Sequence, residues 1–239
     1  MEILILSLCA FFTSIISGII GMGGGITLLS ILSVFLPYNI LVPIHGIVQF
    51  VSNISRTFYL RENIIKSFIY PFILGAPLGM FLAYQVIKEV TNTNYYYSIL
   101  SIFIIYTVFK PKKLPTIKLN KFGWFFLGAA SGFTGSLVGA TGPLIAIFYV
   151  RDDISKEEII ATKAFQQSFI HFCKIPLFLS LSFNYFEYKE IIFLLCLSAL
   201  FGTYVGINFL KRVHKDTFKI LFKLVLLLSA FRLIYKVLI

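Results

Sequence analysis

The 239-residue sequence is poor in charged residues, and above all in acidic ones. Charged residues make up 13% of the chain, about half the share of an ordinary soluble domain, whereas 58% of the residues are hydrophobic. This composition, with a mean hydropathy of +0.90, excludes an ordinary soluble domain and indicates an integral membrane protein. At about 20 residues for each crossing, the chain has room for roughly seven to nine membrane segments and no sizeable domain outside the bilayer.

Residue types that build metal sites and catalytic sites are also scarce. The three cysteines lie in separate apolar segments without the spacing of metal ligands, and we interpret them as packing residues. An intramembrane enzyme would need a carboxylate pair, a serine with a base or a histidine-rich metal cluster. Asp and Glu avoid the deep apolar segments and only three histidines exist, so we expect neither an enzyme nor a cofactor.

The few charges present are mostly basic, with 21 Lys and Arg against 10 Asp and Glu. In a soluble chain this surplus would suggest a nucleic-acid partner. In a membrane protein it is better explained as loop charge that sets the orientation in the lipid bilayer, so no nucleic-acid partner is expected. The N-terminus lacks a basic n-region and an obvious cleavage site, which argues against a cleaved signal peptide.

A glycine-rich stretch interrupts the first apolar segment. Glycine costs a helix about 1 kcal/mol per residue, so the run Gly23, Gly24 and Gly25 predicts a break. Unwound backbone inside a bilayer must pack on protein or line a polar cavity. The same device recurs in the second half at residues 139–143, and two broken helices in matching positions predict a site between two repeats.

The two halves of the chain match at a register of 118 residues. This register superimposes Gly21 on Gly139, Gln49 on Gln167 and Arg56 on Lys174, which duplication explains better than chance. We expect a first transmembrane repeat over residues 1–109, a basic cytoplasmic linker over 110–120 and a second repeat over 121–239. The expected segments are residues 3–36, 40–60, 64–87 and 95–109 in the first half, and 122–150, 158–183, 188–210 and 218–238 in the second.

The distribution of basic loop residues predicts how the broken segments lie in the membrane. If both segments simply cross, 16 basic residues divide 9 to 7 between the two sides. If both are re-entrant hairpins, the division is 13 to 3, with Lys88, Lys189 and Lys236 on the outer side, as expected for a cytoplasmic face. The predicted fold is therefore an all-α integral membrane protein of two inverted repeats, each a re-entrant helix pair plus three transmembrane helices, with both termini outside.

Polar residues occur deep in the span that follows each glycine break. Three residues in each span share one helix face at positions i, i+4 and i+7. They are Gln49, Asn53 and Arg56 in the first half and Gln167, His171 and Lys174 in the second. No carboxylate lies at a matching depth, so the two buried cations favour an anionic ligand.

Other interpretations of these residues remain open. Arg56 and Lys174 could extend to the membrane surface instead of contacting a ligand. The amide side chains could hydrogen-bond between helices, and His171 is a structural residue, a ligand contact or a proton carrier. His45 is a weaker candidate for function. Ser155 is expected to cap a helix that has acidic residues in its first turn.

The glycine breaks complete the predicted anion site. Half-helices starting at Ile26 and Leu144 would direct N-terminal N–H groups at the ligand, and Pro143 suits a first helical position. The candidate substrate-binding residues are Gly23, Gly24, Gly25, Gln49, Asn53, Arg56, Thr141, Gly142, Pro143, Gln167, His171 and Lys174.

The glycine motif and the polar spans together resemble the sulfite exporter TauE/SafE family, also called the four-toluene sulfonate uptake permease family. The matching stretches cover nearly the whole chain: GIIGMGGG (18–25), HGIVQFVSNISR (45–56), GPL (142–144), ATKAFQQSFIHFCK (161–174) and FGTYVGINFLKR (201–212). The resemblance implies a multi-pass permease of the prokaryotic inner membrane for sulfite, organosulfonates or related anions. The second break departs from the family's denser glycine run, and Thr141 is a candidate to replace the missing backbone contact.

We therefore expect a secondary transporter of a small anion, with protons as the candidate coupling ion because histidine is the residue type that ordinarily titrates near neutral pH and His171 is the one on the two polar faces. The alternatives are a passive anion channel with the same site and a structural subunit of another permease. A homo-oligomer is compatible with the sequence.

Overall fold

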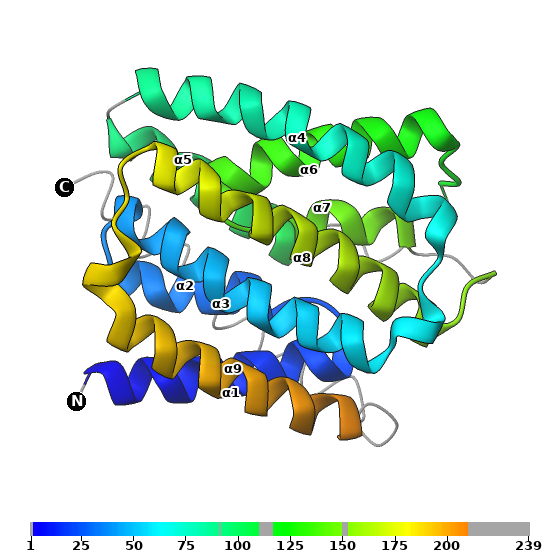
Figure 1. The fold of residues 1–239 in the computed structure, drawn as a ribbon, viewed down its shortest axis with the longest axis horizontal. Coiled ribbons are helices and arrows are strands. Elements are labelled where there is room, and N and C mark those ends of the chain that lie inside the picture. Colours follow the sequence, from blue (N-terminus) through cyan, green and yellow to red (C-terminus); the bar gives the residue numbers. More distant parts are fainter. Residues whose placement is uncertain (1, 91, 110–116, 150–152, 210–239) are drawn as a thin grey trace.

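The computed structural model describes residues 2–90, 92–109, 117–149 and 153–209, and within these ranges the regular structure is helical (Figure 1). The α-helices are α1 (Glu2–Ile20), α2 (Gly24–Phe35), α3 (Tyr38–Tyr59), α4 (Lys66–Glu89), α5 (Thr93–Phe109), α6 (Lys121–Val138), α7 (Gly142–Ala146), α8 (Lys156–Ser180) and α9 (Lys189–Phe209). Short 3₁₀ helices are η1 (Arg61–Asn63), η2 (Ile147–Tyr149) and η3 (Tyr185–Tyr188). The expected span 218–238 and linker residues 110–116 lie outside the described residues.

The first predicted break is confirmed between α1 and α2. Gly21 and Gly23 have φ angles of 71° and 95°, which only glycine adopts readily, and they end the regular helix after Ile20. The chain then reverses and brings Gly24 back against α1, where an added Cβ would overlap the Thr13 carbonyl oxygen. The second half-helix begins at Gly24, two residues before the expected Ile26.

The second predicted break is confirmed between α6 and α7. Gly139 caps α6 in the left-handed conformation with φ of 89°, and its N–H bonds back to the Gly135 carbonyl at 3.1 Å. Gly139 lies 118 residues after Gly21 (139 − 21), so the register of the two halves pairs two glycines that both have a positive φ. The half-helix α7 begins at Gly142, not at Leu144, and Pro143 is its second residue.

Each half of the chain packs a helix against the broken segment of the other half. Helix α4 lies along α6 and helix α9 along α1, as two parallel pairs at opposite edges of Figure 1. Small residues form the packing face of α4, because Cβ atoms at Gly75 and Gly79 would overlap the carbonyls of Phe125 and Ala129. In α9, Gly202 approaches the backbone of α1 in the same way.

Helices α3 and α8 lie between these two pairs and pack against each other (Figure 1). Helix α8 begins with the predicted cap: Ser155 Oγ accepts from Glu158 N at 3.2 Å, and a Glu158 carboxylate oxygen accepts from Ser155 N at 2.8 Å. Because α3 and α8 are the central pair, polar residues on both helices lie in the interior of the protein.

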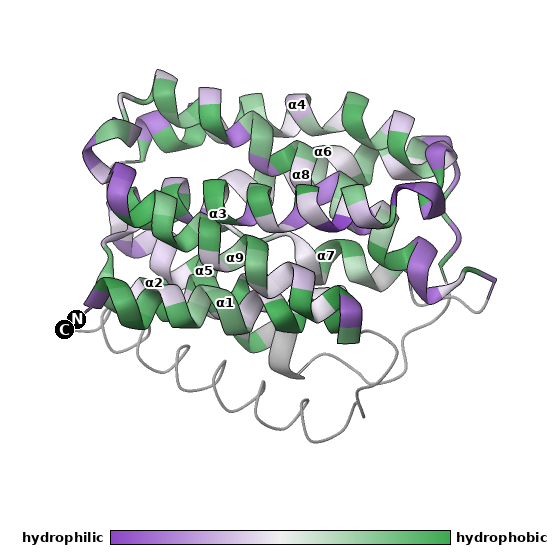
Figure 2. Cartoon of the chain, turned by 60° about the horizontal axis from the view of Figure 1, so that its bottom comes forward, coloured by the Kyte–Doolittle hydropathy of each residue, from purple (hydrophilic) through white to green (hydrophobic). Residues whose placement is uncertain are grey.

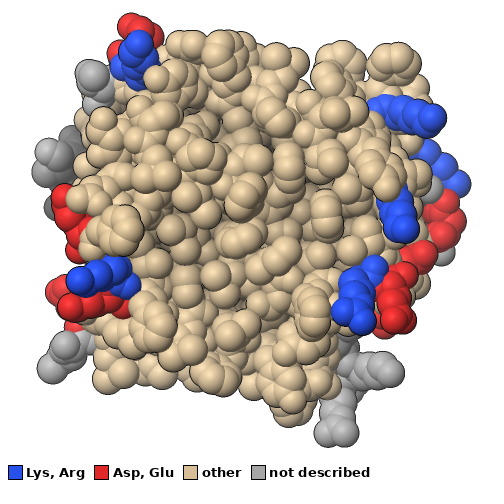
Figure 3. Space-filling view, viewed as in Figure 1, with Lys and Arg blue, Asp and Glu red and all other residues tan. Residues whose placement is uncertain are grey.

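The exterior of the bundle has the polarity expected of a membrane protein. In Figure 3 the charged residues gather at the two ends of the helices, and a broad band between them carries none on that face. Figure 2 shows hydrophobic residues along the helices between more hydrophilic ends. Among the described residues, α1, α4 and the segment Tyr185–Phe209 have the length and hydropathy to cross a membrane.

Candidate functional site

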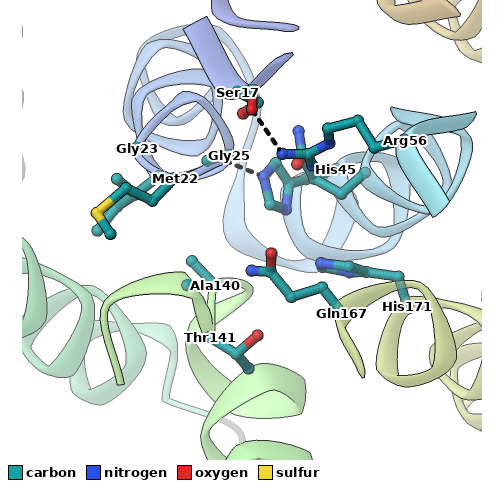
Figure 4. Close-up of a pocket in the computed structure, with 13 residues that line it drawn as sticks. Ser17, Met22, Gly23, Gly25, His45, Arg56, Ala140, Thr141, Gln167 and His171 are labelled. Carbon is teal, nitrogen blue, oxygen red and sulfur yellow. Dashed lines mark hydrogen bonds between the residues drawn. The ribbon is translucent and has the colours of Figure 1, made fainter. Parts of the chain in front are cut away.

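A polar cavity lies where the two helix breaks meet the central helices. Its lining residues come from α1, α2, α3, α7, α8 and both breaks: Ser17, Met22, Gly23, Gly25, Ile26, His45, Gln49, Arg56, Ala140, Thr141, Gly142, Gln167 and His171 (Figure 4). The cavity is small. The centre of a water-sized sphere can occupy about 20 Å³ of it, which is room for about one or two waters.

Arg56 lies inside the protein with only 2% of its surface exposed, so it does not extend to the membrane surface. Its guanidinium donates to Ser17 O at 3.0 Å, to Ser52 O at 3.3 Å and to Asn53 Oδ1 at 2.6 Å. The bond to Ser17 (dashed in Figure 4) places the cation at the C-terminal end of α1, where helix carbonyls carry partial negative charge. Three of its five N–H groups are used, and two remain on Nη1 and Nη2.

Two lysines of α8 have a corresponding role at the breaks. Lys174, 1% exposed, donates from Nζ to Gly139 O at 3.4 Å, at the C-cap of α6. Lys163, also 1% exposed, donates to Gly21 O at 3.1 Å, just beyond the end of α1. Among the described residues, no salt bridge joins Arg56 or Lys174 to a carboxylate. The predicted buried cations are therefore not without partners, because carbonyls at the ends of the broken helices accept their hydrogen bonds.

A glutamine side chain packs against each break. A Cβ on Gly25 would lie 2.8 Å from Gln49 Oε1, and a Cβ on Gly142 would lie 3.2 Å from Gln167 Nε2. Glycine at these two positions thus lets an amide side chain lie directly on the unwound backbone. Since the register pairs Gln49 with Gln167, equivalent residues of the two halves line the same cavity.

Two histidines lie together in the cavity wall. Their ring centroids are 5.9 Å apart, with His45 on α3 and His171 on α8 (Figure 4). His45 Nε2 lies 2.8 Å from Gly25 O, which ties α3 to the first turn of α2. The Nδ1 atoms of both rings and Thr141 Oγ1 are buried and have no hydrogen-bond partner among the described residues.

The structure brings most of the predicted site residues together. Those that line the cavity are Gly23, Gly25, Gln49, Arg56, Thr141, Gly142, Gln167 and His171. Three others lie behind its wall: Gly24 packs on α1, Asn53 holds the Arg56 guanidinium, and Lys174 reaches the α6 C-cap. The side chain of Pro143 lies outside the described residues.

Sequence reasoning missed several residues of this region. Ser17, Met22 and Ala140 line the cavity next to the predicted glycines, His45 was given little weight, and Lys163 was overlooked. A signal was present, because His45 lies four residues before Gln49 on the same helix face and 118 residues before Lys163 (163 − 45). Because His45 and Lys163 are different residue types, comparing the two halves by residue identity does not reveal that they are equivalent.

A family comparison decides the class of protein. The model of the family described as sulfite exporter TauE/SafE matches residues 6–233 of the 239. The chain belongs to the sulfite exporter TauE/SafE family. Its members are integral membrane transporters and not enzymes, in agreement with the apolar helices of this structure. Comparisons with curated proteins and with solved structures each gave no match.

Proposed function

We propose that this TauE/SafE family member is a secondary transporter of small anions, and that the anion binds in the cavity between the two helix breaks. The observation that carries the proposal is the chemistry of the cavity wall. The wall offers a guanidinium, two imidazoles, two amides and two hydroxyls, and the described lining residues include no carboxylate. Such a site favours sulfite, an organosulfonate or a related anion over a cation.

The first turn of α2 supports the same ligand class. The first intrahelical bond of α2 runs from Thr27 N to Gly23 O at 3.0 Å, so the N–H groups before Thr27 lack partners within the helix. Gly23, Gly25 and Ile26 line the cavity, and the N-terminal end of a 12-residue helix attracts negative charge. An anion here would meet backbone donors on one side and Arg56 on another.

The size of the cavity favours a compact ligand. Room for about one or two waters suits an inorganic oxyanion or methanesulfonate better than an aromatic sulfonate. Among the family's substrate classes we therefore favour sulfite-sized anions for this chain.

We also propose that the two halves are inverted repeats whose broken segments are re-entrant hairpins. The chain reverses at the first break, and each half packs a helix against the other half's broken segment. Such an exchange suits a two-fold relation, with the shared site at the axis between the repeats.

Flux measurements on the purified chain in proteoliposomes test the proposed function. The panel is sulfite, methanesulfonate, thiosulfate and short carboxylates, each at two pH values. A transporter gives saturable flux and accumulates an anion against its gradient when a coupling gradient is imposed. Flux that never saturates and runs only downhill would assign a passive channel. Absence of flux for every anion would contradict transport by this chain alone and would favour a subunit of another permease.

A further inference from the structure

Two backbone carbonyls that bracket the first helix break accept hydrogen bonds from the two central helices. Lys163 of α8 donates from Nζ to Gly21 O at 3.1 Å. His45 of α3 lies with Nε2 2.8 Å from Gly25 O, and Nε2 is the donor because a carbonyl oxygen can only accept. The two donors are 118 residues apart (163 − 45), so they occupy equivalent positions in the register of the two halves. One break is therefore held by both halves of the chain.

Helix α8 fixes Gly21 through two different contacts. A Cβ added to Gly21 would lie 2.5 Å from Ile160 Cγ1, so the glycine packs directly on that side chain. Ile160 and Lys163 are three residues apart on α8 and lie on one face of the helix. Their side chains are 2% and 1% exposed. An apolar contact and a hydrogen bond together set the position of Gly21 against α8.

The held residue lies directly beside the cavity without belonging to its wall. Met22 and Gly23 line the cavity, whereas Gly21 and Lys163 are not among its lining residues. Gln167, one turn after Lys163 on α8, does line it. Lys163 therefore acts on the cavity through the backbone of the break and not by direct contact.

The direction of the backbone groups in a break matters for an anion. An unwound segment can turn either carbonyl oxygens, which repel an anion, or N–H groups, which attract it, toward a cavity. In a planar trans peptide the carbonyl and the following N–H point in opposite directions. A donor that holds Gly21 O therefore also fixes the direction of the Met22 N–H, and it offsets the partial negative charge of the oxygen.

We propose that Lys163 is a positioning residue for anion binding, which holds the first helix break through Gly21 O in the conformation that lines the cavity. The inference rests on the proposed anion site and adds to it a residue that does not touch the anion. A residue with a purely structural role would change the stability of the protein and leave the affinity of the folded protein unchanged. A positioning residue changes both.

Hydrogen exchange and calorimetry on the purified protein in lipid nanodiscs test the inference, with sulfite as the probe. Lys163→Met removes the donor at similar side-chain length. We expect faster amide exchange over residues 18–27 but not over residues 135–142 at the second break. Sulfite binding should weaken about tenfold or more, because loss of a hydrogen bond from a charged donor lowers the population of the binding-competent break. Lys163→Arg retains a charged donor and should bind sulfite within about threefold of the wild type.

Ser155→Ala is the matched control, because it removes the N-terminal cap of the same helix without changing a contact to the break. It should lower the melting temperature and leave the sulfite affinity unchanged. If Lys163→Met does not fold, Lys163→Gln, with an amide on a shorter side chain, is measured in the same way.

Three results would overturn the inference: unchanged exchange over residues 18–27 in the Lys163 variant, unchanged sulfite affinity in that variant, or an equal loss of affinity in Ser155→Ala. Failure of sulfite and methanesulfonate to bind to the wild type would instead overturn the proposed function. The two failures are distinguishable, because the second is seen before any residue is changed.

Discussion

Replacing Arg56 with glutamine tests the electrostatic basis of the site. Arg56 is the cation in the cavity wall, and its guanidinium is held by Ser17 O and Asn53 Oδ1 with two N–H groups left over. Glutamine removes the charge but retains an amide donor within the protein. The change therefore separates the effect of charge on anion binding from the effect of hydrogen bonding on the fold.

The expected loss follows from Coulomb's law. Two unit charges about 4 Å apart interact by about 4 kcal/mol at an effective dielectric constant of about 20. An intervening water or a longer contact lowers this value, so we expect a loss of about 3 to 4 kcal/mol, or about 100- to 1000-fold in affinity. Arg56→Lys keeps the charge and loses only the planar fork, so it should recover most of the affinity.

The assay is equilibrium binding of sulfite and methanesulfonate to the protein in nanodiscs, with flux in proteoliposomes as a second measurement. Arg61→Gln is the matched control, because Arg61 is exposed in η1 with its guanidinium over the Phe58 ring at 5.3 Å. Screening by salt should limit the effect of that change to about twofold. A folded Arg56→Gln protein that binds both anions within about threefold of the wild type would refute the electrostatic argument.

Three further outcomes are expected. Gly79→Ala should abolish stable expression, because its Cβ would overlap the Ala129 carbonyl, whereas a Cβ at Gly46 would lie 3.6 Å from the nearest atom, so Gly46→Ala should express normally by fluorescence-detected gel filtration. Lys163→Met should lower the thermal stability of the purified protein, because the hydrogen bond to Gly21 O is lost. Lys163→Arg should retain part of that stability. Equal melting midpoints for the Lys163→Met variant and the wild type would contradict this role. A reporter fused to the N-terminus should lie outside the cytoplasm, and cytoplasmic reporter activity would contradict the re-entrant topology.

Local features of the fold could be predicted from the sequence because each has a local cause. Glycines at positions 21, 23 and 139 end the helices where positive φ is required, and Ser155 caps α8 through contacts within four residues. The exchange of helices, with α4 on α6 and α9 on α1, could not be predicted in this way. The glycines of α4 indicate a close neighbour, but any small-residue face could supply it.

The site was predictable in composition but not in detail. Helical spacing alone placed Gln49 and Arg56 on one face, and in the structure both line the same cavity. Spacing could not show that backbone carbonyls at the helix breaks accept from Arg56 and Lys174, since those carbonyls belong to distant segments. It also could not show that Asn53 contacts Arg56 and not the cavity.

The balance of buried charge explains how the bundle can hold cations without acidic partners and still bind an anion. Helices α1 and α6 each end at a break, and the C-terminal end of a helix is equivalent to about half a negative charge. Such ends lower the cost of burying Arg56 and Lys174, which donate to Ser17 O and Gly139 O, and the cost of burying Lys163, which donates to Gly21 O just beyond the end of α1. The described lining of the cavity includes no carboxylate, so the field beside it stays positive, and the N-terminal end of α2 adds to it. Breaking the helices therefore has two effects: it stabilises the buried cations, and it leaves a field suited to an anion.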